Sequence, residues 1–218
     1  MDSIFSYESK LVQMLLKLAD MMILNIIYVL FCLPIFTIGA AQAGLHAGIR
    51  QLRNQEDDTS CTKAFFRGFA SGFGKITLVH TLGMLVVGVL IRFTIIVLQF
   101  DGGLSFSAWV SIGAISLAIL FLSQIPLFHS NFDCKGIQLP RNAFLIVMAH
   151  PIRSLGVALL IWAPAILGLL DLYLLLRGLP IWMLLYYSTA FLFCNSITKK
   201  PIEGLKEDFR KAQEAEEL

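Results

Sequence analysis

The first apolar block of the chain, residues 21–41, reads MMILNIIYVLFCLPIFTIGAA and contains no charged side chain. About 20 helical residues are enough to cross a hydrocarbon core about 30 Å thick. Apolar residues make up 57% of the 218 positions and charged residues 15%, whereas soluble domains average roughly 45–50% and about 25%. A soluble core would not need uninterrupted apolar blocks of this length. The block and the composition together predict an integral membrane protein.

Four later blocks of the sequence have a similar length and character, and we expect each to be a transmembrane helix. They lie at about residues 76–98, 106–128, 155–176 and 179–194. The predicted fold class is therefore all-α, a polytopic bundle of five transmembrane helices with the two chain termini on opposite faces. A single transmembrane domain would cover residues 1–197, and residues 198–218 would form a charged cytosolic tail. We expect the stretch before the first span, residues 4–18, to be amphipathic and interfacial.

The orientation of the bundle is predicted by its Lys and Arg residues, which gather on the cytoplasmic side of membrane proteins. Outside the spans, the opposite face would receive only Lys10, Lys17 and Arg177. We therefore expect the amino terminus outside and the carboxyl terminus in the cytoplasm. The basic residues that then lie on the cytoplasmic side are Arg50, Arg53, Lys63, Arg67, Lys75, Lys135, Arg141, Arg153, Lys199, Lys200, Lys206, Arg210 and Lys211.

A cleaved secretory signal is the alternative interpretation of the first block. Ala41-Gln42-Ala43 has the small residues of a cleavage site and follows a basic leader and an apolar stretch. The apolar stretch is longer than that of a typical signal, however. Cleavage would also leave the basic residues of the next loop on the outer face. We therefore expect an uncleaved first span.

Two segments between the predicted spans indicate short elbow helices in the cytoplasmic interface. The first, residues 62–73, places Phe65, Phe66 and Phe69 on one side, and Arg67 could reach lipid headgroups. The second, residues 141–149, carries Phe144 and ends where proline interrupts helices, at His150-Pro151.

A candidate internal repeat relates these two elbows. Superposing Phe65 on Phe144 also places Ala70 on Ala149 and the second span on the fourth. The chain would then consist of two span–elbow–span units and a closing helix, related by an axis along the membrane normal. Apolar sequences match one another easily, so chance similarity is the alternative.

Arg92 and Asp171 are the candidate intramembrane ion pair. Each lies at an equivalent depth in the second or fourth span if the repeat holds. A charged residue costs about 2.5–3.5 kcal/mol on insertion scales, so it usually meets a partner, a cavity or the interface. The pair could mark a substrate or ion site. It could instead lock the bundle, or Arg92 could extend to the headgroups.

The remaining polar and sulfur-containing residues suggest no catalysis, metal or cofactor. We find no nucleophile, zinc-protease or phosphate-loop motif, and we expect Asn25 to form hydrogen bonds between helices. The histidines lack the i, i+4 spacing of a metal site. We expect all four cysteines to be unpaired, and they are Cys32, Cys61, Cys134 and Cys194.

One run of residues resembles a known family. Its pattern is Leu24-Asn25-x-x-Tyr28-x-Leu30-Phe31-x-Leu33-Pro34-x-x-Thr37-x-Gly39-Ala40-Ala41-x-Ala43, followed by the aromatic elbow. The run is similar to the start of the YesL-like membrane proteins, the family called domain of unknown function 624. The resemblance implies a multi-pass protein of the bacterial cytoplasmic membrane, associated with carbohydrate importers of the ABC type. It supplies no catalytic residues.

Two functions are therefore expected from the sequence. The first is a non-catalytic accessory or assembly subunit of a bacterial carbohydrate ABC importer, with importer permease subunits and membrane lipids as partners. The alternative is a small-solute transporter or channel, which would have a polar cavity between the second and fourth spans. A net charge of +2 suggests no nucleic-acid partner. The sequence leaves a homo-oligomer open.

Overall fold

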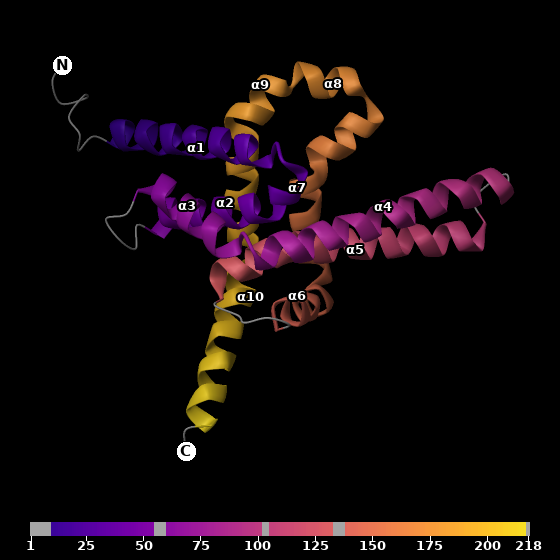
Figure 1. The fold of residues 1–218 in the computed structure, drawn as a ribbon. Helices are drawn as coiled ribbons and strands as arrows, with labels where there is room; N and C mark the ends of the chain where they lie inside the picture. The colour runs from indigo at the N-terminus through magenta and orange to yellow at the C-terminus, as the bar shows by residue number, and fades with distance from the viewer. Residues whose placement is uncertain (1–9, 55–59, 102–104, 133–137, 217–218) are drawn as a thin grey trace.

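The computed structural model describes residues 10–54, 60–101, 105–132 and 138–216, and every regular element in these ranges is a helix (Figure 1). The part of the predicted leader before Lys10 lies outside the described residues, as does Cys134. In the described ranges, four helical stretches are long and apolar enough to cross a membrane. They indicate a multi-pass membrane protein and are Leu11–Cys32, Lys75–Phe100, Phe106–Asn131 and Pro151–Gly168.

The first helix, α1 (Lys10–Cys32), ends well before the predicted end of the first span at Ala41. Proline has no N–H to donate and disfavours a helical conformation at the residue before it, so the chain leaves the helix ahead of Pro34. The backbone of Pro34 is extended, with φ −77° and ψ 115°, and a short 3-10 turn follows, η1 (Ile35–Thr37). The Thr37 hydroxyl lies 2.6 Å from the carbonyl oxygens of both Phe31 and Pro34, which provides a donor at the break.

The next helix, α2 (Ile38–Asn54), lies in the centre of the molecule, where the sequence analysis placed the end of a span and a loop. Most of its side chains are buried. Small residues explain this position because they let α3 (Cys61–Gly72) approach the α2 backbone closely. A Cβ atom added at Gly68 would lie 2.7 Å from the Cβ of Ala47. One added at Gly44 would lie 2.9 Å from the carbonyl oxygen of Phe65.

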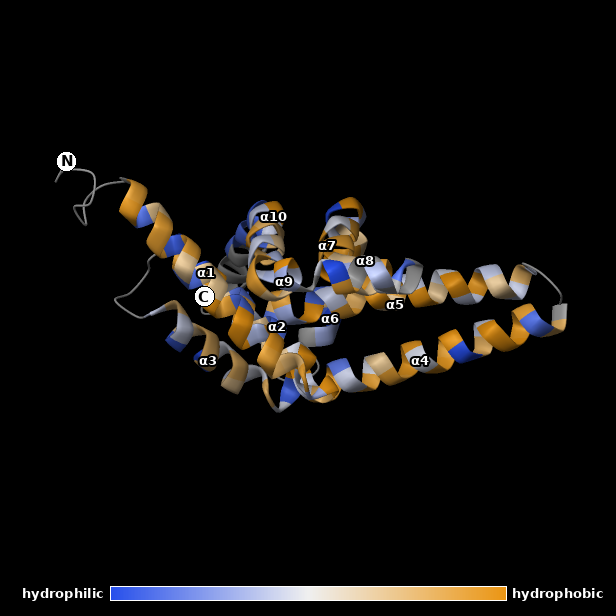
Figure 2. Cartoon of the chain, turned by 90° about the horizontal axis from the view of Figure 1, so that it is seen from above, coloured by the Kyte–Doolittle hydropathy of each residue, from blue (hydrophilic) through white to orange (hydrophobic). Residues whose placement is uncertain are grey.

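Helices α4 (Lys75–Asp101) and α5 (Phe106–Asn131) form a long hairpin that projects away from the other helices (Figures 1 and 2). They cover the second and third predicted spans. The Thr94 hydroxyl donates to the Ser111 hydroxyl over 2.8 Å and joins the two helices in the projecting half. Both views show the hairpin running across the axes of α7 and α10.

The fourth predicted span is shorter in the structure. Helix α6 (Gln138–Ala149) leads to α7 (Pro151–Leu170), which starts with proline in its first turn, where the missing N–H has no helical partner to lose. At Asp171 the backbone is extended, with φ −154° and ψ 106°, and a short helix α8 (Leu172–Arg177) follows.

Short helices occupy both segments in which the sequence predicts elbows, α3 and α6. In the first proposed unit the helix α2 lies between α1 and α3, whereas residues 133–137, between α5 and α6 in the second, lie outside the described residues. The repeat stays a prediction.

The last apolar block is divided among three consecutive helical segments. They are α9 (Leu179–Ile181), the π-helical segment η2 (Trp182–Tyr186) and α10 (Tyr187–Glu216), which follow one another without a break. Helix α10 continues through the charged tail towards the carboxyl end (Figure 1). The predicted fifth span, residues 179–194, is therefore not among the four candidate spans found in the described ranges.

Two hydrophobic clusters hold the described helices together. The first joins α1, α2, α3, α7 and α10, with Leu24, Phe65 and Phe191 among its fully buried members. The second joins α2, α4, α5 and α6 around Ile76 and Phe128. Because α2 contributes to both clusters, it connects the α4–α5 hairpin to the rest of the protein.

Candidate functional site

A pocket of about 210 Å³ lies among α1, α2, α4, α7 and α10. Met84 of α4 and Trp162 of α7 both contribute to its wall, so it lies between the second and fourth predicted spans. This is where the transporter alternative expects a cavity. None of the lining residues is charged, and they are Tyr28, Val29, Cys32, Ile38, Gln42, Met84, Ile161, Trp162, Ala165 and Tyr187.

The polar wall of this pocket centres on Gln42 of α2. Its side chain is 3% exposed, and its Oε1 atom has no hydrogen-bond partner in the structure. The rings of Tyr28 and Tyr187 lie beside one another, with centroids 4.9 Å apart. Trp162 donates its indole N–H to the Ser123 hydroxyl over 3.0 Å, so that donor is already in use. The pocket therefore offers aromatic surface and one unused amide oxygen.

A polar stripe continues from Gln42 along one face of α2. Gln42, His46 and Arg50 follow at intervals of four residues, which places them on the same side of a helix. His46 is 1% exposed, and its Nδ1 donates to the Asn195 side-chain oxygen of α10 over 3.0 Å. Arg50 donates to the Ser130 carbonyl at the end of α5. The stripe thus connects α2 with both α10 and α5.

His46 is uncharged at neutral pH because of where it lies. Burial lowers its pKa to about 3, and the positive charge of Arg50 acts in the same direction. The hydrogen bond that His46 donates to Asn195 opposes the shift only in part. The Nε2 atom of His46 is buried without a hydrogen-bond partner. The group is thus a neutral polar side chain at a junction of helices rather than a charged one.

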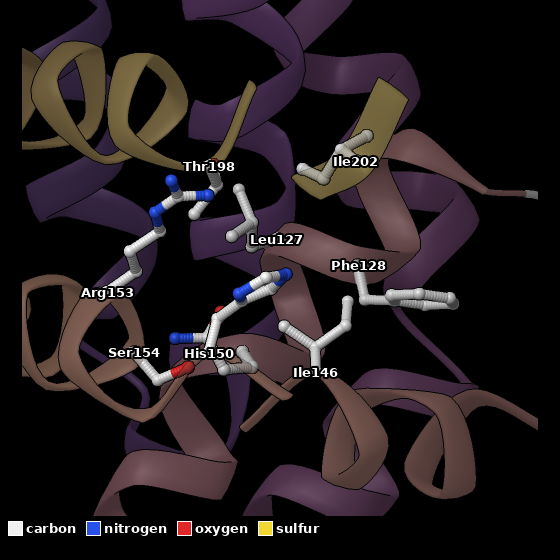
Figure 3. Close-up of a pocket in the computed structure, with 9 residues that line it drawn as sticks. Leu127, Phe128, Ile146, His150, Arg153, Ser154, Thr198 and Ile202 are labelled. Atoms are coloured by element: carbon white, nitrogen blue, oxygen red, sulfur yellow. The ribbon is translucent and has the colours of Figure 1, made fainter. Parts of the chain in front are cut away.

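A second, much smaller pocket of about 10 Å³ lies where α5, α6, α7 and α10 meet (Figure 3). This volume is about that of one water-sized probe. Figure 3 shows Arg153 beside Thr198 of α10, with His150 near the centre and Ile146 and Phe128 on the other side. Gln124 also lines this space, and its buried Nε2 atom has no partner. The small pocket is suited to one water molecule.

Asn25 explains how α1 holds the π-helical segment. Its side-chain N–H groups donate to the carbonyl oxygens of Trp182 and Met183 over 2.9 and 2.7 Å. Its side-chain oxygen accepts from the Ser188 backbone N–H over 2.9 Å. A π-helical segment leaves backbone groups outside the regular i to i+4 pattern, and Asn25 pairs them. The prediction of hydrogen bonding between helices by Asn25 is confirmed.

Arg92 and Asp171, the predicted intramembrane pair, are not brought together by the structure. Both side chains are described and exposed, and no ion pair joins them. Asp171 instead accepts a hydrogen bond from the Tyr173 backbone N–H over 2.8 Å, because the chain turns into α8 at that point. The superposition that equated the two positions did not anticipate the end of α7 at Leu170.

The predicted interfacial contacts on the first elbow have mixed surroundings. Phe65 is fully buried in the core rather than available to an interface, whereas Phe66 and Arg67 are exposed. The rings of Phe65, Phe66 and Phe69 all contact Phe31 at the end of α1, with centroids 6.0, 5.7 and 4.8 Å away. The elbow is therefore attached to α1 through Phe31.

The second elbow presents Phe144 differently. Its ring is nearly half exposed, and its centroid lies 6.5 Å from that of Phe121 on α5. A lipid headgroup region could therefore reach Phe144 but not Phe65.

Sequence reasoning missed Gln42 and the His46–Asn195 contact. The available signal was the spacing of Gln42 and His46 by four residues within a run of small residues, which indicates a polar stripe on a tightly packed helix. No local pattern links His46 to Asn195, because the contact requires α10 to fold back. Within the described ranges there is no cluster of three metal-ligating side chains, and Cys32, Cys61 and Cys194 are free.

Comparison with known proteins finds a family model that matches part of the chain. The profile of the family "Protein of unknown function, DUF624" matches residues 21–94. No curated protein and no solved structure matches the chain. The matched segment includes most of α1, the break at Pro34, the buried helix α2, the elbow α3 and most of α4. Residues 21–94 of this protein are a DUF624 family domain.

Proposed function

We propose that the protein is a non-catalytic accessory or assembly subunit of a carbohydrate ABC importer in a bacterial cytoplasmic membrane. The observation that carries the proposal is the exposed apolar surface of the projecting half of the α4–α5 hairpin. The carbohydrate importer as partner rests on the family resemblance alone. Importer permease subunits and lipids are the proposed neighbours of this surface.

The hairpin is suited to pack beside another membrane protein. Phe100 and Phe106, near its tip, are 86% and 84% exposed, and Phe93 and Trp109 are at least half exposed. Side chains of this kind must be covered by lipid or by a partner. The Thr94–Ser111 hydrogen bond fastens the two helices to each other, so the surface keeps its shape before a partner binds.

The proposal includes five membrane crossings, with the amino terminus outside and the carboxyl terminus in the cytoplasm. The fifth crossing would be the uninterrupted run of α9, η2 and the start of α10. The distribution of Lys and Arg supports this orientation.

Photo-crosslinking in native membranes tests the accessory function. A photoreactive amino acid at Phe93 or Trp109 on the hairpin should form adducts with importer permease subunits. The matched control is Leu159 on α7, which is also about half exposed and should form fewer adducts.

Copurification in detergents that keep importers intact should retain the same permease subunits. Adducts with lipid alone, together with no retained importer subunit, would contradict the proposal. Adducts with a second copy of this chain would indicate a homo-oligomer instead.

A small-solute transporter or channel is the second candidate, favoured by the 210 Å³ pocket between α4 and α7. Purified protein in liposomes should then move a small neutral solute, and Gln42→Leu should change the rate because Gln42 lines the pocket. Liposomes that remain tight to sugars and ions alike would exclude this function.

A further inference from the structure

The pocket at Gln42 has the properties of a ligand site of defined chemistry. We propose that it binds an uncharged, mainly apolar small molecule of about the size of a phenol, which donates a hydrogen bond from a hydroxyl or N–H group to Gln42 Oε1. Binding does not require transport, so this inference stands or falls separately from both functions proposed above.

The absence of charge in the pocket wall selects an uncharged ligand. None of the ten lining residues is Asp, Glu, Lys, Arg or His. Moving an ion from water into such surroundings is strongly unfavourable unless an opposite charge meets it. A carboxylate or an ammonium group would meet none here.

The unused oxygen of Gln42 selects a hydrogen-bond donor. Its Oε1 is buried and has no partner. Buried polar atoms are nearly always paired, and leaving one unpaired costs stability. The Gln42 side chain interacts with Tyr28, but no tyrosine or tryptophan group nearby donates to its Oε1. A ligand hydroxyl in the pocket can supply it.

The remaining wall selects an apolar or aromatic body. Val29, Ile38, Met84, Ile161 and Ala165 present aliphatic surface. Tyr28, Tyr187 and Trp162 add ring surface, against which another ring packs in an offset or edge-on arrangement. A strongly hydrated polyol would lose more hydrogen bonds with water than this wall returns.

The volume limits the size of the ligand. About 10–15 Å³ of such a volume holds one water molecule, so about 210 Å³ is room for on the order of fifteen. A six-membered ring with one hydroxyl fits within this space. The small pocket at Gln124, of about 10 Å³, has room only for water and therefore serves as an internal control.

Three probes of similar size test separately whether the ligand must be uncharged and whether it must donate a hydrogen bond. The full-length protein in lipid nanodiscs is titrated with para-fluorophenol, para-fluorotoluene and para-fluorobenzoate, and binding is followed by fluorine NMR. Empty nanodiscs of the same lipid measure partition into the membrane. We expect para-fluorophenol to bind about tenfold more tightly than para-fluorotoluene after this correction. We expect no saturable binding of para-fluorobenzoate.

Two glutamine variants locate the site. Gln42→Leu keeps the volume but removes the acceptor, so it should lower the affinity for para-fluorophenol about tenfold and leave that for para-fluorotoluene unchanged or higher. Gln124→Leu removes a buried amide from the small pocket. It should change neither the affinity for para-fluorophenol nor that for para-fluorotoluene. Binding of para-fluorophenol that never exceeds its partition into empty nanodiscs would overturn the proposal. So would equal binding by the wild type and Gln42→Leu, or saturable binding of the benzoate.

Cys32 provides a second readout that needs no change at Gln42. It lines the pocket, whereas Cys61, also partly buried, lies at the start of α3 outside it. In a chain whose other cysteines are replaced by serine or alanine, para-fluorophenol should slow the reaction of Cys32 with a neutral thiol reagent. In a second chain, in which Cys61 is the cysteine that is kept, para-fluorophenol should not slow the reaction of Cys61 with the same reagent. Equal effects on both cysteines would show a general membrane effect and would reject the site.

Discussion

At the scale of single residues, Asn25 and His46 show how buried polar side chains connect distant parts of this chain. Asn25 on α1 pairs backbone groups of the π-helical segment, and His46 on α2 binds Asn195 on α10. Most other buried residues of these two helices are apolar, with Gln42 on α2 as a polar exception. Their hydrogen bonds therefore define how α1 and α2 fit against the carboxyl-terminal helices.

Replacing Asn25 tests this role directly. Asn25→Leu removes the N–H groups that donate to the Trp182 and Met183 carbonyl oxygens and the oxygen that accepts from the Ser188 N–H. Hydrogen bonds between membrane helices contribute on average about 0.6 kcal/mol each, and an unpaired buried group costs about 1–3 kcal/mol. We expect the free energy of unfolding in bicelles to fall by about 1–3 kcal/mol. Ser116→Ala, which removes an exposed hydroxyl that bonds only within α5, should change it by less than about 0.5 kcal/mol.

His46 makes stability depend on pH in a defined window. Its pKa is about 3 when folded and about 6.5 when unfolded. Between these values the unfolded chain therefore binds more protons. The stabilising contribution is complete above pH 6.5 and decreases as the pH falls, by up to about 1.4 kcal/mol per unit. The free energy of unfolding is measured between pH 6.5 and 4 for the wild type and for His46→Gln. The difference between the two profiles gives the slope that His46 contributes. Parallel profiles would show that His46 does not contribute.

At the scale of elements, the close packing of α2 against α3 depends on positions where a side chain has no room. Gly44 and Gly48 of α2 and Gly68 of α3 all lie at such contacts. A Cβ at Gly68 would meet the Cβ of Ala47 at 2.7 Å and the carbonyl oxygen of Ala43 at 3.1 Å. Neither atom belongs to a flexible side-chain end, so the helices themselves would have to separate.

The same substitution at two glycines separates packing from helix propensity. Gly68→Ala should lower the free energy of unfolding by about 1–3 kcal/mol because the added methyl group overpacks the contact. Gly88→Ala in α4 meets nothing within 4 Å and should be neutral or stabilising by up to about 1 kcal/mol, the usual advantage of alanine in a helix. Thermal unfolding in detergent micelles measures both. A stabilised Gly68→Ala variant would show that α2 and α3 are not closely packed.

At the scale of the whole molecule, the number of crossings follows from whether residues 179–194 span the membrane. With five crossings, Gly178 and the carboxyl terminus lie on opposite faces, whereas a chain with four crossings would place them on the same face. A single cysteine replacing Gly178 should react with a membrane-impermeant thiol reagent added outside intact cells. A cysteine added after Leu218 should react only once the cells are opened. Reaction of both from the same side would reject the fifth crossing.

The hairpin of α4 and α5 also concerns the shape of the whole molecule. It meets the rest of the protein at one end only (Figure 2). If partner binding depends on this surface, Phe93→Ala combined with Trp109→Ala should reduce copurification of importer subunits severalfold without lowering the thermal stability. The matched pair on α7, Leu159→Ala with Leu155→Ala, also replaces two roughly half-exposed apolar side chains and should leave copurification unchanged. Equal losses in both pairs would point to general damage rather than to a binding surface.

Local sequence was enough to predict the helical class, the hairpin of α4 and α5, and the two short helices α3 and α6. Composition, apolar length and spacing act within a few turns of the chain, and they specify these elements without reference to distant residues. The same reasoning placed Pro34 inside a span, because hydropathy averages over a break. It also assigned α2 to a loop, because a helix rich in glycine, alanine and polar residues resembles one.

Packing between distant segments accounts for what sequence reasoning could not supply. Gln42 and His46 are buried because α2 is enclosed by α1, α3 and α10, and the pocket exists because five helices converge there. Arg92 and Asp171 are apart because the direction of each helix, and not depth along it, decides which side chains meet. Contacts of this kind depend on the arrangement of whole helices, which apolar periodicity does not encode.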